Sequence, residues 1–146
     1  MRFSRSSLYA LYGMTLLAGA PPAAVLPLSK IRRRLRVAPS HLAKIFQALV
    51  RVGLLKSSRG VGGGFSLARP AERITALDII LAVYGPRPDL DCPIHSGARG
   101  EGCAVGRLID EGRRRMKEVL GQATLADLAG RSRGGPTGNA PGRARL

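Results

Sequence analysis

One stretch, residues 42–70, restricts the fold more than any other part of the chain. Its first part spaces apolar residues at intervals of three and four, the pattern of one helix face, and they are Leu42, Ile45, Phe46, Leu49 and Val50. Gly53 then has the position of a residue that ends a helix in the left-handed conformation. Two short strands about the segment GVGGG follow, with Arg59 at the base of the turn. We therefore expect a helix that leads directly into a basic, glycine-rich β-hairpin.

Two further helices are expected before this stretch. The first runs from about Ser4 to Ala18, and prolines at 21 and 22 end it. The second opens at Ser29, a good N-cap residue, and directs Ile31 and Leu35 inward. Pro39 suits the first turn of the third helix, because its missing N–H would lack a partner there anyway. The fold class is therefore mainly α with a small β-hairpin, a winged helix-turn-helix.

The charge distribution indicates the kind of partner. The chain has 24 Lys and Arg against 9 Asp and Glu, a formal charge of +15. Residues 1–71 hold 12 of the basic residues and no acidic one. A half-domain without carboxylates attracts a polyanion over its surface, so a nucleic acid is the leading partner. Together with the winged helix-turn-helix layout, this makes double-stranded DNA the expected partner. A generally basic or solubilising charge is the alternative explanation.

The start of the third helix holds the candidate base-reading residues. Ser40, His41 and Lys44 lie off its apolar face. In a helix-turn-helix, the N-terminal residues of the second helix reach base edges in the major groove. Ser40 can donate or accept, and Lys44 can reach guanine or phosphate. His41 could contact DNA or simply be solvated.

The glycine-rich turn is the second candidate contact. Gly60, Gly62, Gly63 and Gly64 are expected to form it, and at Gly60 and Gly62 the lack of side chains lets the backbone approach DNA closely. Arg59 could then enter a narrow A·T-rich minor groove. A nucleotide-binding P-loop is excluded, because a strand-like FSL follows the glycines instead of Lys and Ser or Thr opening a helix.

The second half of the chain predicts three more segments. Thr75 and Asp78 form a capping box for a helix whose predicted apolar face is Leu77, Ile80, Leu81 and Tyr84. A loop follows over residues 86–102. A long helix is expected from Cys103 to Leu120, with one side formed by Val105, Leu108, Ile109, Gly112, Met116 and Val119. A partner subunit could cover that side, or the helix could fold back on the first helix.

The two ends of the chain have separate interpretations. Thr124 and Asp127 form another capping box, and residues 131–146, rich in Gly, Pro and Arg, are expected to be a disordered basic tail. The apolar run over residues 8–20 resembles a signal peptide, but its helical spacing favours a core helix. No run approaches the roughly 20 apolar residues of a membrane span. We therefore expect a cytoplasmic protein with no membrane partner.

Four segments resemble the Rrf-type family of bacterial winged-helix transcriptional regulators. They are RGVGGGFSLARP, ITALDIILAVYGP, the opening MRFSRSSLYAL and the late TLADL. The resemblance covers about residues 1–129. It implies a homodimer in which Cys103–Leu120 is the crossing dimerisation helix. It also implies a palindromic operator contacted by Ser40, Lys44 and Arg59.

The chain departs from this family in its cysteines. Cluster-binding members carry three cysteines in the loop, whereas this chain has Cys92 and Cys103 and lacks the middle one. His95 is a candidate third ligand. Three interpretations stay open: a [2Fe–2S] cluster with mixed ligation, thiol-based redox sensing by the two cysteines, and a loop without a sensor. Two cysteines and one histidine do not make a closed zinc site.

The expected organisation is a DNA-binding domain over 1–86, a sensor loop over 87–102, a dimerisation helix with a short terminal helix over 103–130, and the tail over 131–146. The expected function is that of a sequence-specific, dimeric DNA-binding repressor responsive to cluster state or thiol redox. A regulator without a sensor and a non-specific nucleic-acid-binding protein are the alternatives. The sequence shows no acid pair, catalytic triad or nucleotide loop, so an enzyme is not expected.

Overall fold

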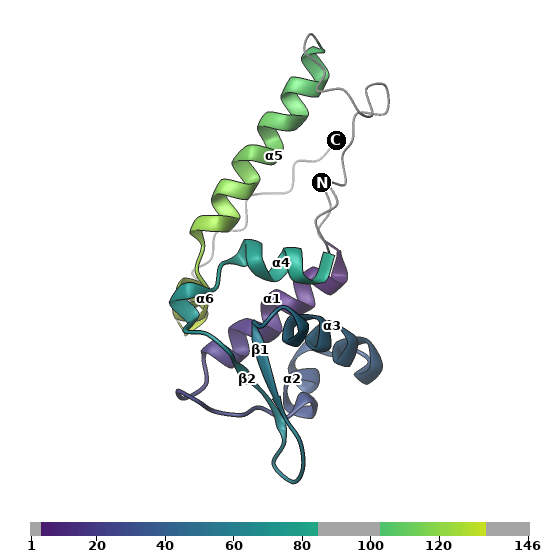
Figure 1. Cartoon of the computed structure of the whole chain (residues 1–146), viewed down its shortest axis with the longest axis vertical. Coiled ribbons are helices and arrows are strands. Elements are labelled where there is room, and N and C mark those ends of the chain that lie inside the picture. Colours follow the sequence, from purple (N-terminus) through teal and green to yellow (C-terminus); the bar gives the residue numbers. More distant parts are fainter. Residues whose placement is uncertain (1–3, 85–102, 134–146) are drawn as a thin grey trace, which may run out of the picture.

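The computed structural model describes residues 4–84 and 103–133. Its elements, in chain order, are α1 (Arg5–Ala18), α2 (Leu28–Leu35), α3 (Pro39–Arg51), β1 (Leu55–Ser58), β2 (Gly64–Leu67), the short 3₁₀ helix η1 (Ala71–Arg73), α4 (Ala76–Tyr84), α5 (Ala104–Gln122) and α6 (Leu125–Arg133). Helices α1 to α4, the hairpin and α6 form a head, from which α5 projects (Figure 1). The expected fold class is confirmed.

The core of the head is aliphatic around one phenylalanine. Phe46 of α3 is fully buried, and its ring meets that of Phe65 on β2 edge to face, with 5.1 Å between centroids. Gly13 lets α1 approach this ring, because a Cβ at Gly13 would lie 2.7 Å from Phe46 Cζ. Burying such a side chain stabilises the fold by about 1.5–3 kcal/mol. The other buried apolar side chains of the head are Ala10, Met14, Leu17, Ile31, Val37, Leu42, Ile45, Leu49, Leu54, Leu55, Ile74, Ala76, Ile79, Leu125 and Ala129.

Helix α3 forms as its sequence predicts. Pro39 occupies the first turn, and Ala38 precedes it without a side-chain cap. Four of the five expected apolar residues are buried, and Val50 is half-buried. Gly53 adopts φ +70° just after the helix, as expected for a left-handed residue that ends it. The buried face therefore fixes which side of α3 points away from the core.

The predicted start of α2 is wrong by about two residues. The helix begins at Leu28 after Pro27, and no side chain caps it, so Ser29 lies inside the first turn. The preceding residue, Leu26, exchanges two backbone hydrogen bonds with Phe65 of β2, each 2.9 Å. This bridge keeps the chain extended up to Pro27, whose fixed φ then suits the entry to a helix. Ile31 is buried as expected.

The hairpin has a shorter turn than predicted. β1 and β2 pair antiparallel, and Gly64 belongs to β2 opposite Ser58 rather than to the turn. A Cβ at Gly64 would lie 2.2 Å from the Leu26 carbonyl oxygen, so glycine is required there by the close approach of the bridging segment. Gly60 and Gly62 have φ of +93° and +80°, which side chains rarely adopt. These two residues make the tight turn at the tip.

The predicted apolar face of α4 is wrong. The buried residues are Ala76 and Ile79, whereas Leu81 and Tyr84 are exposed. The reason is that α4 is apolar on nearly all sides, so its spacing alone fits two faces equally well. The capping box at its start is confirmed, since Thr75 and Asp78 exchange side-chain-to-backbone hydrogen bonds of 2.9 and 3.1 Å.

Helix α5 does not fold back on α1. It packs against α4 at its C-terminal end, and none of its residues is buried. The backbone there is tied to the head, because Ala76 N–H donates to the Ala123 carbonyl at 2.9 Å and Leu125 N–H to that of Ile74 at 2.7 Å. The rest of α5 extends away from the head (Figure 1).

The end of α5 and the start of the tail also differ from the prediction. α5 continues two residues beyond Leu120, to Gln122. The second capping box is confirmed by the hydrogen bonds between Thr124 and Asp127. The helix that it opens, α6, continues to residue 133, so the predicted tail begins three residues too early. The remainder of the predicted tail lies outside the described residues.

Candidate nucleic-acid interface

The first turn of α3 presents its polar residues outward. Ser40, His41 and Lys44 are all exposed, while Leu42 and Ile45 of the same turns are buried. The core therefore holds α3 from one side only. The structure brings the three predicted base-reading residues together on the opposite, solvent-facing side.

His41 differs from its two neighbours because another element contacts it. Its Nε2 lies 3.2 Å from the Ser6 hydroxyl of α1. The Tyr9 ring packs edge to face against the imidazole, with centroids 6.0 Å apart and planes at 81°. No sequence pattern predicts either contact, since 35 residues separate Ser6 from His41. A histidine expected either to be solvated or to face DNA is thus anchored to the N-terminal part of α1.

The hairpin tip is an exposed part of the head. Arg59 is exposed just before the two left-handed glycines. A Cβ at Gly60 or at Gly62 would meet nothing within 4 Å, so open space surrounds the backbone there. Val61 between them is fully exposed. The tip is therefore narrow enough, and basic enough, to enter a groove of a polyanion.

Helix α2 adds a cluster of cations. Lys30, Arg36 and the three arginines 32–34 are exposed. Residues 4–71 contain no carboxylate, so these cations have no acidic partner within their own segment. Helix α2 and the hairpin lie at the end of the molecule opposite α5 (Figure 1). This end is strongly electropositive, which attracts a phosphate backbone.

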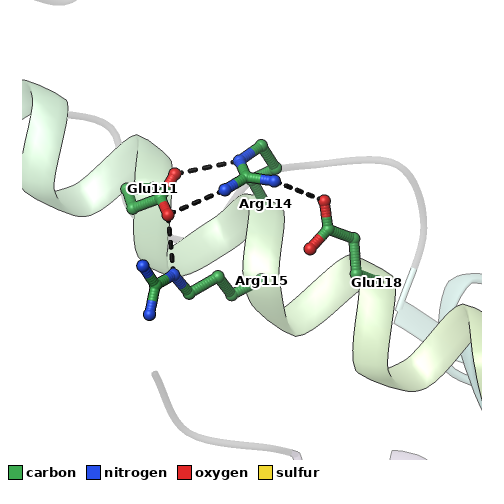
Figure 2. Close-up of polar contacts among 4 residues, drawn as sticks. All are labelled: Glu111, Arg114, Arg115 and Glu118. Atoms are coloured by element: carbon green, nitrogen blue, oxygen red, sulfur yellow. Dashed lines mark hydrogen bonds and ion pairs between the residues drawn. The ribbon is translucent and has the colours of Figure 1, made fainter.

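The arginines of α5 are arranged differently. Glu111 accepts hydrogen bonds from Arg114 at 2.8 and 2.9 Å and from Arg115 at 2.6 Å, and Arg114 also donates to Glu118 (Figure 2). The Arg114 and Arg115 hydrogen bonds lower the pKa of Glu111 from 4.5 to about 2. Asp110 pairs with Arg113 at 3.3 Å. These ion pairs follow helical i, i+3 and i, i+4 spacing and neutralise much of the helix surface.

Cys103 is the one candidate sensor residue within the described part of the chain. It is the N-cap of α5, and its Sγ accepts a hydrogen bond from Gly106 N–H at 3.4 Å. Cys92 and His95 lie outside the described residues. Within residues 4–84 and 103–133, no three His, Cys, Asp or Glu residues gather as metal ligands, so a cluster site cannot be built from these residues alone.

The fold and this surface define a class, that of a winged-helix DNA-binding transcriptional regulator. A family model described as Rrf2, iron-dependent transcriptional regulator, matches residues 3–131. The chain therefore belongs to the Rrf2 family, and the resemblance seen in the sequence is confirmed. None of the helices in the described ranges is long and apolar enough to cross a membrane.

Named relatives agree with this class. The HTH-type transcriptional regulator IscR of Xenorhabdus nematophila is 31% identical over 129 residues, which cover 88% of this chain and 79% of that protein. Among solved structures, CymR, the global cysteine regulator of B. subtilis, superimposes with a TM-score of 0.78 at 30% identity, over 90% of this chain and 98% of that one. The oxidised form of CymR from Staphylococcus aureus gives a TM-score of 0.72 at 29% identity, over 88% of this chain and 96% of that one.

Proposed function

We propose that this regulator binds a palindromic operator as a homodimer and represses transcription in the cytoplasm. The observation that carries the proposal is the solvent-facing first turn of α3 beside an exposed basic hairpin, in a segment without a single carboxylate. A non-specific nucleic-acid-binding protein would need the charge but not this geometry. A two-fold dimer places one such head on each half-site, about one helical turn apart.

The proposed contacts divide between the two grooves. Ser40, His41 and Lys44 read base edges or phosphates from α3 in the major groove. Arg59 enters the adjacent minor groove, where narrow A·T-rich sequence carries the strongest negative potential. The backbone at Gly60 and Gly62 approaches the sugar–phosphate chain, because no side chain stands between them. The cations of α2 neutralise phosphates alongside.

The dimer contact is proposed for α5. Val105, Leu108 and Val119 are 60%, 73% and 65% exposed on this helix, and Leu81 and Tyr84 of α4 are also exposed. Monomeric proteins rarely leave so many large apolar side chains in water along one helix. A second copy of α5 lying across the first would cover them. The two heads would then be held at a fixed separation by the two helices.

The signal is proposed to act on Cys103. Its Sγ accepts a hydrogen bond from Gly106 N–H at the start of α5, and a cysteine sulfur is a group that can ligate iron or react with an oxidant. Two of the three interpretations use this residue: a [2Fe–2S] cluster held with Cys92 and His95, and a reversible disulfide between Cys92 and Cys103. The third is a loop without a sensor. The oxidised CymR structure makes redox chemistry relevant to the family fold.

The visible absorption spectrum of protein purified without air separates the three interpretations. Charge-transfer bands that disappear in Cys103→Ser would identify the cluster. A colourless protein whose two thiols are lost together on mild oxidation, and recovered by a reductant, would identify the disulfide. Operator affinity that is the same for reduced, oxidised and metal-free protein would show that neither form of sensing operates.

Selection of binding sites from random duplex DNA tests the operator proposal. We expect enriched sequences with two inverted half-sites about one helical turn apart, each with an A·T-rich segment where the hairpin enters. Footprinting should show protection of both half-sites at one dimer per site. Enrichment of single, unpaired half-sites would contradict the dimer, and no enrichment would contradict sequence-specific binding.

A further inference from the structure

The contact between Ser6 and His41 determines what His41 can offer to DNA. A neutral imidazole carries one proton on one of its two nitrogens, and the partner of one nitrogen fixes the role of the other. The Ser6 hydroxyl is hydrogen-bonded to His41 Nε2, with 3.2 Å between the two atoms. No other hydrogen bond to this ring is found among the described residues, so Nδ1 is the nitrogen that DNA can meet.

The surroundings favour a donor at Nδ1. Phosphate oxygens only accept hydrogen bonds, and guanine presents two acceptors in the major groove. No carboxylate within residues 4–71 competes for an N–H group on this face. A proton on Nδ1 requires that Nε2 accept, and the rotatable hydroxyl of Ser6 can supply the proton for that bond.

We propose that Ser6 is a positioning residue: its hydroxyl donates to His41 Nε2 and so keeps the imidazole proton on Nδ1, facing DNA. The Tyr9 ring packs edge to face on the imidazole and keeps the imidazole plane in place. Ser6 determines which imidazole nitrogen carries the proton. This inference rests on the DNA contact proposed for His41. It adds two residues of α1 to the reading surface, although neither lies on α3 or on the hairpin.

Nuclear magnetic resonance of the imidazole nitrogens tests the proposal directly on DNA-free protein. The chain has only two histidines, so a His95→Gln background leaves His41 as the single signal. At alkaline pH we expect the Nδ1–H form in wild type and in Ser6→Thr, which keeps the hydroxyl. In Ser6→Ala we expect the Nε2–H form, which free histidine prefers. Wild type in the Nε2–H form, or no change in Ser6→Ala, would overturn the proposal.

Operator binding supplies the second readout. Losing one such hydrogen bond typically costs about 1 kcal/mol, so Ser6→Ala should bind roughly fivefold more weakly, with Ser6→Thr close to wild type. In a His41→Ala background, Ser6→Ala should have no further effect. Tyr12→Phe removes an exposed hydroxyl of α1 outside this contact and is the control, with affinity expected to be unchanged.

The outcomes separate this inference from the function on which it rests. Additive losses for Ser6→Ala and His41→Ala would overturn the positioning role alone, since Ser6 would then act without His41. His41→Ala with wild-type affinity would contradict the His41 contact itself. Lys44→Ala and Arg59→Ala would in that case still report whether the rest of the proposed reading surface is correct.

Discussion

Two arginine-rich regions of this molecule have opposite electrostatic surroundings. On α5, carboxylates lie within ion-pair distance of the arginines 113–115. On α2, α3 and the hairpin, the cations belong to a segment of 71 residues without one carboxylate. The same residue type therefore has two uses. On α5 it supports a helix through local pairs, and on the head its charge stays available to a polyanion.

The two regions also differ in burial. The head encloses a core around Phe46, whereas α5 has no buried residue and exposes three large apolar side chains. The head therefore has a hydrophobic core of its own. Helix α5 leaves large apolar side chains exposed beyond its contact with α4, which is why we propose the dimer contact for this helix. The following predictions test this division, from the largest effect to the smallest.

Removing the central ring of the head should have the largest effect. Phe46→Ala leaves a cavity between α1, α3 and β2, and should lower the free energy of unfolding by about 3–5 kcal/mol. Chemical denaturation measures the change. The matched variant on α5 is Arg107→Ala, at an exposed position off the apolar side of this helix, where a shift within about 0.5 kcal/mol is expected. Equal destabilisation by the two variants would contradict the contrast between head and α5.

A charge on the apolar side of α5 should break the dimer without unfolding the head. Leu108 is 73% exposed in the single chain, so Leu108→Glu costs the head little. Burying the new carboxylate in a dimer contact would be costly. We expect monomers in analytical ultracentrifugation and an operator affinity lower by on the order of 100-fold, because two linked heads bind far more tightly than one. Arg107→Glu, off this side of the helix, is the control and should remain dimeric.

Arg59→Ala should weaken operator binding by about tenfold and relax the preference for A·T pairs where the hairpin enters. The control is Arg114→Ala on α5, whose guanidinium pairs with Glu111 and Glu118. That variant should bind within about twofold of wild type, because exposed ion pairs contribute little free energy. Fluorescence anisotropy with half-site variants measures both quantities. Similar losses for the two arginines would mean that binding senses net charge alone.

Single substitutions on α2 should change the salt dependence more than the specificity. Arg33→Ala removes one phosphate contact, so the slope of log affinity against log salt should fall in magnitude by about 1, equally on operator and random DNA. Arg115→Ala removes the same charge from α5 and should leave the slope unchanged. A loss confined to the operator would assign Arg33 to base reading instead.

The pH dependence of α5 should be the smallest effect. The pKa of Glu111 is lowered from 4.5 to about 2, so its ion pairs are fully present above 4.5 and are lost as the pH falls toward 2. Glu111→Gln should therefore reduce the hydrogen-exchange protection of α5 slightly near neutral pH, and the difference from wild type should vanish at the acid end of that range. A difference that persisted when the carboxyl is protonated would point to packing instead of charge.

Local signals in the sequence were sufficient for much of the fold. Both capping boxes, Pro39 and Gly53 mark helix ends by chemistry confined to a few neighbouring residues, and all four stand where expected. The spacing of apolar residues in α3 predicts its buried face correctly, because the opposite face of this helix is polar. The predicted exposure of Ser40, Lys44 and Arg59 follows from that spacing and from the turn glycines.

Errors arose where distant segments decide the structure. The sequence predicts Gly64 as a turn residue. In the structure, glycine is needed there because the Leu26 carbonyl, from a distant part of the chain, lies too close for a side chain. Which face of α4 is buried depends on the elements that pack around it. The spacing of apolar residues does not determine this face, because α4 is apolar on nearly all sides. The Ser6–His41 contact joins two helices through an ordinary serine and has no pattern in the sequence.

Comparing operator with random DNA over a salt series tests the central claim most directly, that the electropositive end of the head reads sequence and does not merely attract charge. Affinity for both should fall with a similar slope, because the phosphate contacts are shared. The ratio of the two affinities should persist at high salt, because base contacts by α3 and the hairpin set it. A ratio that falls to one as salt rises would contradict the account and identify an electrostatic binder.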